Sequence, residues 1–304
     1  MDIFKQKLTL LALSAVCVLL VWTPPALAGQ WTDTDVFVDT TNAAYLISQG
    51  AAVVDARESR DFRAGHIPQA ANLHWQDFVD GSTSGEIIDD DRHLSSLLGN
   101  AGVSSERPVI VYGNWSQEGA WGEEGRLYWT LEYLGHSQVY ILEGGLAGWQ
   151  EVGGPVERGS RAPSADERSD FAIDRQHERR VSTDELRHRL SNSDSLVLLD
   201  TREKEEYAGQ IKYGEQRSGH IPGAKHLWWR DLLDDDGHLK SRDKIQGILA
   251  DLGIAKDSQI VAYCTGGVRS GFVYAVLRAA GFEAVQNYDA SMWDWTRRDD
   301  TPLQ

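Results

Sequence analysis

The chain has 304 residues with 46 acidic and 30 basic side chains, so its formal net charge at neutral pH is −16. A charge of this sign and size disfavours binding to nucleic acid and to anionic lipid, and we expect neither as a partner. The length suggests two domains of ordinary size.

The first segment of the chain has the features of an export signal. Two lysines precede an apolar stretch from Leu8 to Trp22, and the residues from Ala26 to Ala28 fit the small-x-small cleavage pattern. A retained membrane anchor is the alternative, but the apolar stretch is shorter than the roughly 20 residues that a spanning helix needs. We expect cleavage of residues 1–28, near Ala28–Gly29. The product would be a periplasmic or secreted protein without a stable membrane anchor.

The rest of the sequence contains an internal duplication. Four blocks of the first half recur in the second half, in the same order and at a nearly constant offset. The paired blocks are residues 53–58 with 198–203, 65–70 with 219–224, 109–112 with 260–263, and 143–149 with 289–295. A period of this length indicates duplicated domains rather than a solenoid of short repeats.

Within each half, short β-branched runs alternate with helical patterns, such as those at 184–190 and 244–252. This alternation predicts βα units, and therefore an α/β fold with a parallel sheet covered by helices. The stretch 156–170 is rich in charged residues, serine, alanine and proline, which is typical of a linker. The predicted boundaries are 29–157 for the N-terminal domain, 158–172 for the linker and 173–304 for the C-terminal domain.

After cleavage, Cys264 would be the single cysteine of the chain and could not form an internal disulfide. It follows the apolar run 260–263, which predicts a buried strand. It precedes a Gly-rich loop and a helical pattern at about 270–280. A buried inert cysteine is the ordinary alternative, but the flanking loop favours a reactive thiol.

The residues that follow Cys264 can stabilise an anion. Gly266 and Gly267 permit positive φ angles, so the amides from Thr265 to Ser270 can converge on one point. The helix that follows adds the positive end of its dipole, and Arg269 adds a fixed positive charge. Both effects lower the pKa of a thiol, and the thiolate is the reactive form.

Two reactions fit a cysteine in such a loop: phosphoester hydrolysis through a phosphocysteine, and sulfur transfer through a persulfide. Resemblance to cysteine phosphatases ties the first reaction to a Cys-x5-Arg loop. The interval from Cys264 to Arg269 is Cys-x4-Arg, one residue too short, which favours sulfur transfer. A non-catalytic binding or redox-sensing module is a further alternative, against which the intact loop argues.

Taken together, these motifs resemble the tandem-domain rhodanese-like sulfurtransferases, the family that includes thiosulfate and 3-mercaptopyruvate sulfurtransferases. The resemblance covers residues 35–302. It rests on the Asp-x-Arg at 200–202, the Gly-His-Ile-Pro-Gly-Ala at 219–224, the Cys264 loop, and residues 288–295. It implies two domains, each a parallel sheet with helices on both faces, and no cofactor. It also implies that Cys264 takes a sulfur from a small donor and passes it to an acceptor, which could be cyanide, a small thiol or a protein thiol.

The resemblance assigns catalytic roles to Cys264 and Arg269. The residues that it places in the active-site loop or beside the substrate are Thr265, Gly266, Gly267, Val268, Ser270, Asp200 and Arg202. For Asp200 and Arg202, an ion pair that merely closes the end of a strand is an equally good interpretation. No histidine or cysteine pair has the spacing of metal ligands, so we expect no metal.

Histidines and tryptophans elsewhere are interpreted as structural. His66 and His220 each stand in a Gly-His-Ile-Pro block and are expected to fix a turn. For the run 228–230 and for Trp293 and Trp295, packing is favoured over a place at the pocket.

The first half departs from the family because Gly113 stands where the second half has Cys264. It cannot form a persulfide, and by resemblance to tandem family members it has a scaffolding role. Its Trp115 and Trp121 are candidates for reaching over the active loop.

The second half departs as well, since Gly266 and Glu206 stand where thiosulfate-type members tend to carry cations. An insertion at about 209–218 contributes Lys212 and Arg217, which are candidates to replace these cations. The identity of the sulfur donor therefore stays open.

Overall fold

The computed structural model describes residue 31 and residues 36–81, 84–161, 168–192 and 196–304. The expected export signal at 1–28 and part of the expected linker, residues 162–167, lie outside these described residues. Within the described part of the chain, no helix is both long enough and apolar enough to cross a bilayer.

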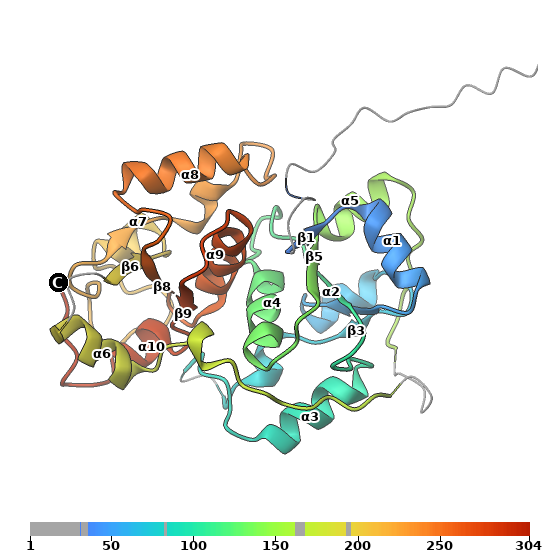
Figure 1. The fold of residues 1–304 in the computed structure, drawn as a ribbon, viewed down its shortest axis with the longest axis horizontal. Helices are drawn as coiled ribbons and strands as arrows, with labels where there is room; N and C mark the ends of the chain where they lie inside the picture. The colour runs from blue at the N-terminus through green and yellow to red at the C-terminus, as the bar shows by residue number, and fades with distance from the viewer. Residues whose placement is uncertain (1–30, 32–35, 82–83, 162–167, 193–195) are drawn as a thin grey trace, which may run out of the picture.

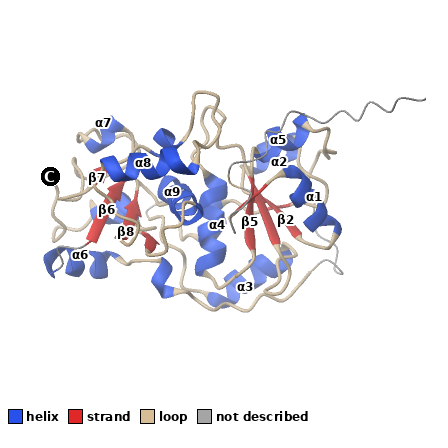
Figure 2. Ribbon diagram, turned by 45° about the horizontal axis from the view of Figure 1, so that its top comes forward, coloured by secondary structure: helices blue, strands red, loops and turns tan. Residues whose placement is uncertain are grey.

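The two halves of the sequence form two α/β units, each built around a parallel sheet (Figures 1 and 2). The strands of the first sheet lie in the order β1-β5-β4-β2-β3 and are β1 Phe37–Val38, β2 Ala52–Asp55, β3 Ala71–Asn72, β4 Val109–Tyr112 and β5 Val139–Leu142. The strands of the second lie in the order β7-β6-β8-β9 and are β6 Leu196–Asp200, β7 Lys225–His226, β8 Gln259–Tyr263 and β9 Val285–Asn287.

Helices cover both sheets. Those of the first half are α1 Thr40–Ser48, α2 Ser59–Ala64, α3 Asp91–Asn100, α4 Glu123–Tyr133 and α5 Gly145–Glu151. Those of the second half are α6 Thr183–Asn192, α7 Lys204–Tyr207, α8 Arg242–Asp251, α9 Val268–Ala279 and α10 Ser291–Trp295. The predicted α/β fold with two tandem domains is confirmed.

The central strands β4 and β8 explain why this sequence forms parallel sheets. All four residues of β4 are buried, as are the last four of β8. A strand covered by helices on both faces must be apolar along its whole length, and the runs Val-Ile-Val-Tyr and Ile-Val-Ala-Tyr meet that requirement. Each strand delivers the residue after it to the carboxyl edge of its sheet.

Helices α4 and α9, which follow these central strands, pack against each other and join the two halves (Figure 1). A Cβ atom at Gly125 would lie 2.3 Å from the Cα of Phe272, and one at Gly271 would lie 2.8 Å from the Cα of Arg126. The two backbones therefore approach so closely that only glycine fits at either place. The contact fixes one half against the other.

The described end of the expected linker packs on the first half. The hydroxyl of Ser169 donates to the carbonyl of Val103 at 2.7 Å, and Phe171 is buried in the core. The chain therefore reaches the second half along the surface of the first.

Candidate active site

Cys264 lies directly after β8, where the sheet ends, and its side chain is 1% exposed. Its Sγ accepts a hydrogen bond from the N–H of Gly267 at 3.1 Å, and its own N–H donates to the hydroxyl of Ser291 at 3.1 Å. Gly267 has a φ of +79°, and a Cβ there would lie 2.3 Å from Nη1 of Arg126. The tight turn therefore requires glycine at this position.

Helix α9 begins at Val268, two residues earlier than the sequence predicts. Val268, Arg269 and Ser270 accordingly belong to its first turn rather than to the loop. The loop itself shrinks to Thr265, Gly266 and Gly267, which brings the positive end of the helix dipole close to the sulfur.

The pKa of the Cys264 thiol is lowered from its ordinary value. Burial favours the neutral thiol and raises the pKa, but the charge of Arg269 and the N–H groups of Ser270 and Gly266 stabilise the thiolate and outweigh burial. At a given pH, more of this cysteine is therefore in its nucleophilic form than of a free cysteine.

Arg269 lies beside the thiol but is held by Glu206. Its Nη1 and Nη2 donate to the two carboxylate oxygens of Glu206 at 2.6 and 2.9 Å, and Nη2 also donates to the hydroxyl of Thr265 at 2.6 Å. Burial would raise the pKa of Glu206, but the bonds from Arg269 outweigh it and lower that pKa. The pair is almost wholly buried, with side-chain exposures of 4% and 0%.

The structure places Asp200 and Arg202 behind the loop. Nε and Nη2 of Arg202 donate to the two oxygens of Asp200 at 2.9 and 2.7 Å, and Nη2 also donates to the carbonyl of Gly219 at 3.1 Å. Neither side chain lines the pocket that opens onto Cys264. The pair ties the end of β6 to the turn at 219–224.

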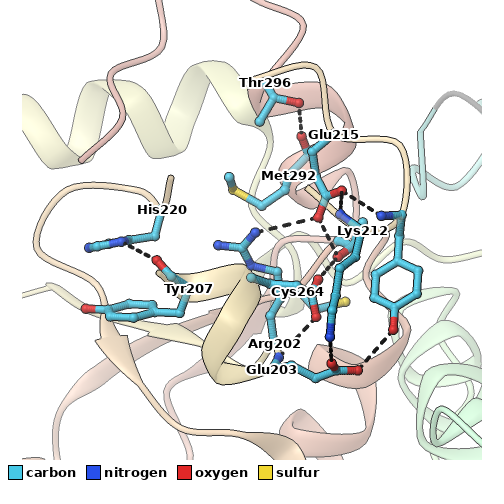
Figure 3. A network of polar contacts seen from close by, with 12 residues as sticks. Arg202, Glu203, Tyr207, Lys212, Glu215, His220, Cys264, Met292 and Thr296 are labelled. Carbon is cyan, nitrogen blue, oxygen red and sulfur yellow. Dashed lines mark hydrogen bonds and ion pairs between the residues drawn. The ribbon is translucent and has the colours of Figure 1, made fainter. Parts of the chain in front are cut away.

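The insertion at 209–218 does not supply the expected cations, so that suggestion from the sequence is wrong. Lys212 forms an ion pair with Glu203, and Figure 3 shows its side chain extended toward that carboxylate. Arg217 donates to the carbonyls of Trp295 and Thr296, each at 3.0 Å. Neither side chain lines the pocket.

The insertion instead contributes Tyr213 to the site. The N–H of Tyr213 donates to Glu215 at 2.9 Å and its hydroxyl to Glu203 at 3.0 Å. Its carbonyl accepts a bond of 2.7 Å from the indole of Trp293. Tyr213 therefore lines the cavity over the active loop, while most of the insertion faces solvent.

A cavity of about 190 Å³ opens onto the thiol, and its walls come from both halves of the chain. The lining residues are Trp75, Trp121, Tyr213, Cys264, Thr265, Gly266, Val268, Arg269 and Trp293. A larger cavity of about 710 Å³, lined in part by Glu132 and Arg278, lies elsewhere and holds no cysteine. Volume alone would therefore have pointed to the wrong site.

Two of the tryptophans differ from their predicted places. Trp293, expected to pack, lines the cavity. Trp115, a candidate for the active loop, is instead buried against Phe272 with ring centroids 5.7 Å apart, whereas Trp121 does reach the cavity. Trp229 and Trp295 are buried in the core, as packing residues are.

The two histidines occupy equivalent structural positions. Nδ1 of His66 lies 2.9 Å from the carbonyl of Phe62, and Nδ1 of His220 lies 2.9 Å from the carbonyl of Tyr207 (Figure 3). Each imidazole stacks on the ring of that same residue at 3.9 Å. Both histidines thus fix turns.

The first half also supports the active loop through residues that sequence reasoning missed. Arg126 of α4 is fully buried, and burial lowers its pKa to about 10. It donates to the carbonyl of Gly85 at 2.5 Å and to that of Gly266 at 3.5 Å. The N–H of Ile87 donates to Asp289 at 3.0 Å. The sequence gives no signal for Arg126, because α4 also carries Glu123, Glu124 and Glu132.

At the position equivalent to Cys264, the first half holds a buried carboxyl group. A Cβ at Gly113 would lie 2.5 Å from Oε2 of Glu124. Oε1 of Glu124 accepts the N–H of Trp115 at 2.8 Å, and burial raises the pKa of Glu124 to about 8. This carboxyl group fills the space into which a cysteine side chain would project.

Among the described residues, no group of three or more histidine, cysteine, aspartate or glutamate side chains is arranged to hold a metal ion. The groups that the structure does bring to the site are the thiol, the loop amides and the buried ion pair around it.

Comparison with known proteins identifies relatives for almost the whole chain. The family described as "Rhodanese-like domain" matches twice, at residues 40–152 and 182–298. A thiosulfate sulfurtransferase of Azotobacter vinelandii is 33% identical over 262 residues, which are 86% of this chain and 93% of that protein. A thiosulfate sulfurtransferase of Pseudomonas aeruginosa is 30% identical over 253 residues, 83% of this chain and 90% of that one.

Solved structures agree on the fold. A 3-mercaptopyruvate sulfotransferase of Escherichia coli superposes with a TM-score of 0.73 at 25% identity, covering 84% of this chain and 98% of that chain. An anaerobic ergothioneine biosynthesis enzyme of Chlorobium limicola superposes with a TM-score of 0.77 at 21% identity, covering 89% and 70%.

Proposed function

The chain belongs to the rhodanese-like family and is a sulfurtransferase, and we propose that Cys264 carries the transferred sulfur as a persulfide. The observation that carries this proposal is the position of the sulfur. Sγ lies at the floor of the cavity and accepts the N–H of Gly267 at 3.1 Å, next to Arg269. These are the groups that stabilise a sulfur anion.

The reaction has two steps. In the first, the Cys264 thiolate attacks the outer sulfur of thiosulfate or the thiol sulfur of 3-mercaptopyruvate; with 3-mercaptopyruvate the carbon–sulfur bond breaks and the enolate of pyruvate leaves with the electron pair. With thiosulfate, the bond between the two sulfurs of the donor breaks, a new S–S bond forms to Cys264, and sulfite leaves with the electron pair. In the second, an acceptor such as cyanide or a thiolate attacks the outer sulfur and restores the Cys264 thiolate.

The surroundings of the thiol provide for the second sulfur. The hydroxyl of Ser270 is buried beside Cys264 and stabilises its thiolate by hydrogen bonding. It is a donor available to the outer sulfur of a persulfide.

Intact mass spectrometry tests this proposal. The protein is incubated with thiosulfate, or separately with 3-mercaptopyruvate, and is expected to gain the mass of one sulfur atom and lose it on addition of cyanide. The Cys264→Ser variant should show no gain and should lose turnover by more than about a thousandfold, as expected when a nucleophile is removed. Folded, reduced protein that gains no sulfur from either donor would instead favour a binding or sensing module.

We further propose that the protein is exported. The support is the sequence of residues 1–28, with its two lysines, apolar stretch and small-x-small site. Fractionation of the producing cell should recover a chain that begins at Gly29 outside the cytoplasm. Recovery of a chain that keeps Met1 in the cytoplasm would contradict export and leave the persulfide proposal untouched.

A further inference from the structure

Arg126 of α4 is a fully buried cation that has no carboxylate partner among the described residues. The other arginines around the active loop form ion pairs, which are Arg180 with Asp289, Arg202 with Asp200 and Arg269 with Glu206. A buried charge without a partner is destabilising. Other contacts must therefore compensate the charge of Arg126.

Those contacts are with backbone carbonyl groups and with an aromatic ring. Nη2 of Arg126 donates to the carbonyl of Gly85 at 2.5 Å, and the guanidinium carbon lies 4.8 Å from the ring centroid of Trp129. Nη1 donates to the carbonyl of Gly266 at 3.5 Å, a long bond to which the full charge of the guanidinium adds a charge–dipole attraction. A Cβ at Gly85 would lie 2.0 Å from that carbonyl oxygen. Arg126 thus links a tightly packed segment of the first half to the active loop of the second.

The carbonyl of Gly266 belongs to the same peptide group that binds the sulfur. A trans peptide is planar, so its C=O and its N–H point in opposite directions. The N–H of this peptide is that of Gly267, which donates to Sγ of Cys264 at 3.1 Å. The next carbonyl along the chain, that of Gly267, accepts Nδ2 of Asn287 at 3.2 Å. Because both residues flanking the peptide are glycine, its own freedom to rotate is large, and its neighbours decide where its N–H points.

Arg126 is the charged group that acts directly on this peptide. Burial lowers its pKa to about 10, while the negative charges of Asp289 and of the Cys264 thiolate oppose that change, so it is a cation at neutral pH. Within the described part of the chain, no other charged side chain is hydrogen-bonded to the Gly266 carbonyl. The remaining charged side chains of the region are held in ion pairs with one another, and they are Arg180, Arg202, Arg269, Asp200, Asp289, Glu86, Glu206 and Glu215.

We infer that Arg126 is a positioning residue for sulfur transfer, which holds the Gly266 carbonyl so that the N–H of the same peptide stays directed at the sulfur of Cys264. This inference rests on the proposed role of Cys264 as the sulfur carrier. The positive charge beside the carbonyl also polarises the peptide and strengthens its N–H as a donor to the thiolate. The half without a thiol therefore supplies a residue on which the reaction of the other half depends.

Two substitutions at Arg126 separate its charge from its bulk. Arg126→Gln removes the charge, whereas Arg126→Lys keeps it. The alkylation of Cys264 by iodoacetamide is followed as a function of pH, since the thiolate is the reactive form. In Arg126→Gln the midpoint should move to higher pH, and the rate at a pH below the midpoint should fall about tenfold, as expected when a hydrogen bond to a charged group is weakened. The fall in Arg126→Lys should be less than half as large. The rate of sulfur uptake from thiosulfate, followed by intact mass, should decrease in the same order.

Glu132→Gln is the matched control, because Glu132 lies on the same helix and in the same contact between the halves, but its bonds are to residues outside the active loop. It accepts the hydroxyl of Tyr274 of α9 at 2.8 Å and lies 3.7 Å from Arg179. This variant should leave the midpoint of alkylation and the rate of sulfur uptake unchanged. A shift as large as that in Arg126→Gln would mean that a looser contact between the halves causes both effects, and would overturn the inference.

A folded Arg126→Gln protein with the native midpoint would overturn it as well. If that variant does not fold, the native chain decides. With arginine labelled for NMR, the guanidinium signals of Arg126, identified by their loss in Arg126→Lys, should move as Cys264 ionises and stay fixed over the same pH range in Cys264→Ser. Signals that do not respond to Cys264 would contradict the inference. If Cys264 takes up no sulfur from any donor while the midpoint still moves in Arg126→Gln, the proposed function falls and the positioning of the thiolate is upheld.

Discussion

The two halves of this protein build the same scaffold and treat the end of its central strand in opposite ways. After β8 the chain places a thiol at the floor of an open cavity, beside Arg269 and the N–H of Gly267. After β4 it places Gly113, and the carboxyl group of Glu124 occupies the space where a side chain would project. The fold supplies the position at the end of the strand, and the few residues that follow decide whether a site exists there.

The Asp-x-Arg motif occurs in both halves and makes the same contacts in each. Arg57 donates to Asp55 and to the carbonyl of Gly65, just as Arg202 donates to Asp200 and to the carbonyl of Gly219. The first of these pairs stands in a half that has no thiol after its central strand. The Asp-x-Arg motif therefore has a structural role. In each half, its arginine holds the turn that lies beside the central strand.

The largest expected difference in stability between the halves comes from the residue that precedes Tyr207 in α7 and Phe62 in α2. Glu206→Ala leaves the buried guanidinium of Arg269 without its partner and should lower the free energy of unfolding by about 3–5 kcal/mol. Its counterpart, Asp61, is 46% exposed and pairs with Arg60 on the surface. Asp61→Ala should cost less than about 1 kcal/mol. Urea unfolding measures both, and similar losses would show that the Arg269 pair is not the buried tie described above.

Restoring a cysteine to the first half should fail to create a second site. Gly113→Cys forces a Cβ against Oε2 of Glu124 at 2.5 Å, so the variant should be less stable by about 1–3 kcal/mol. In a Cys264→Ser background it should take up no sulfur, because no arginine like Arg269 faces that position among the described residues. A persulfide on the introduced cysteine, detected by intact mass analysis, would mean that the scaffold alone suffices.

The buried carboxyl group of the first half should make stability depend on pH. The pKa of Glu124 is raised to about 8 by burial, so its contribution to stability is full below the unfolded pKa and is lost as the pH rises toward 8. The loss should not exceed about 1.4 kcal/mol per pH unit. Glu124→Gln should flatten this decline between about pH 5 and pH 8, measured by urea unfolding, whereas Glu118→Gln at an exposed position should not. Parallel slopes in all three proteins would contradict a buried, protonated Glu124.

The smallest expected effect is on the pH dependence of the alkylation of Cys264. The lowered pKa of Cys264 predicts that its alkylation by iodoacetamide reaches half its maximal rate at a lower pH than that of a free cysteine, because Arg269 and the loop amides outweigh burial. In the variant that combines Gly113→Cys with Cys264→Ser, the same measurement should give a midpoint above that of a free cysteine, since the new thiol is buried beside Glu124. Coincident midpoints would show that the two surroundings do not differ electrostatically.

The sequence predicted what short-range patterns encode. The apolar run before Cys264, the glycines after it and the duplicated blocks were enough for the α/β fold, the tandem arrangement and the position of the thiol. The first turn of α9 was missed by two residues because Val268 and Arg269 carry no start signal of their own. The glycine pair of the loop therefore masked the true beginning of the helix.

The aromatic walls of the site, apart from the candidate Trp121, could not be predicted in the same way. Trp75, Trp121, Tyr213 and Trp293 come from four separate segments, and only the folded chain brings them together. In the sequence, Glu206 occupies a position where thiosulfate-type members tend to carry a cation. In the fold, it is the partner of Arg269. Arg126 gave no usable signal, because a charged residue within a buried helix has meaning only once the opposite backbone is known.

Because α4 and α9 pack backbone against backbone, the two halves of this protein cannot be separated without exposing their contact. The second half on its own would keep Cys264 but would lose Trp75 and Trp121 from the walls of its cavity and expose the apolar face of α9 to water. The copy without a thiol has therefore become a permanent part of the catalytic unit. The two halves together therefore form a site that the half with Cys264 could not form alone.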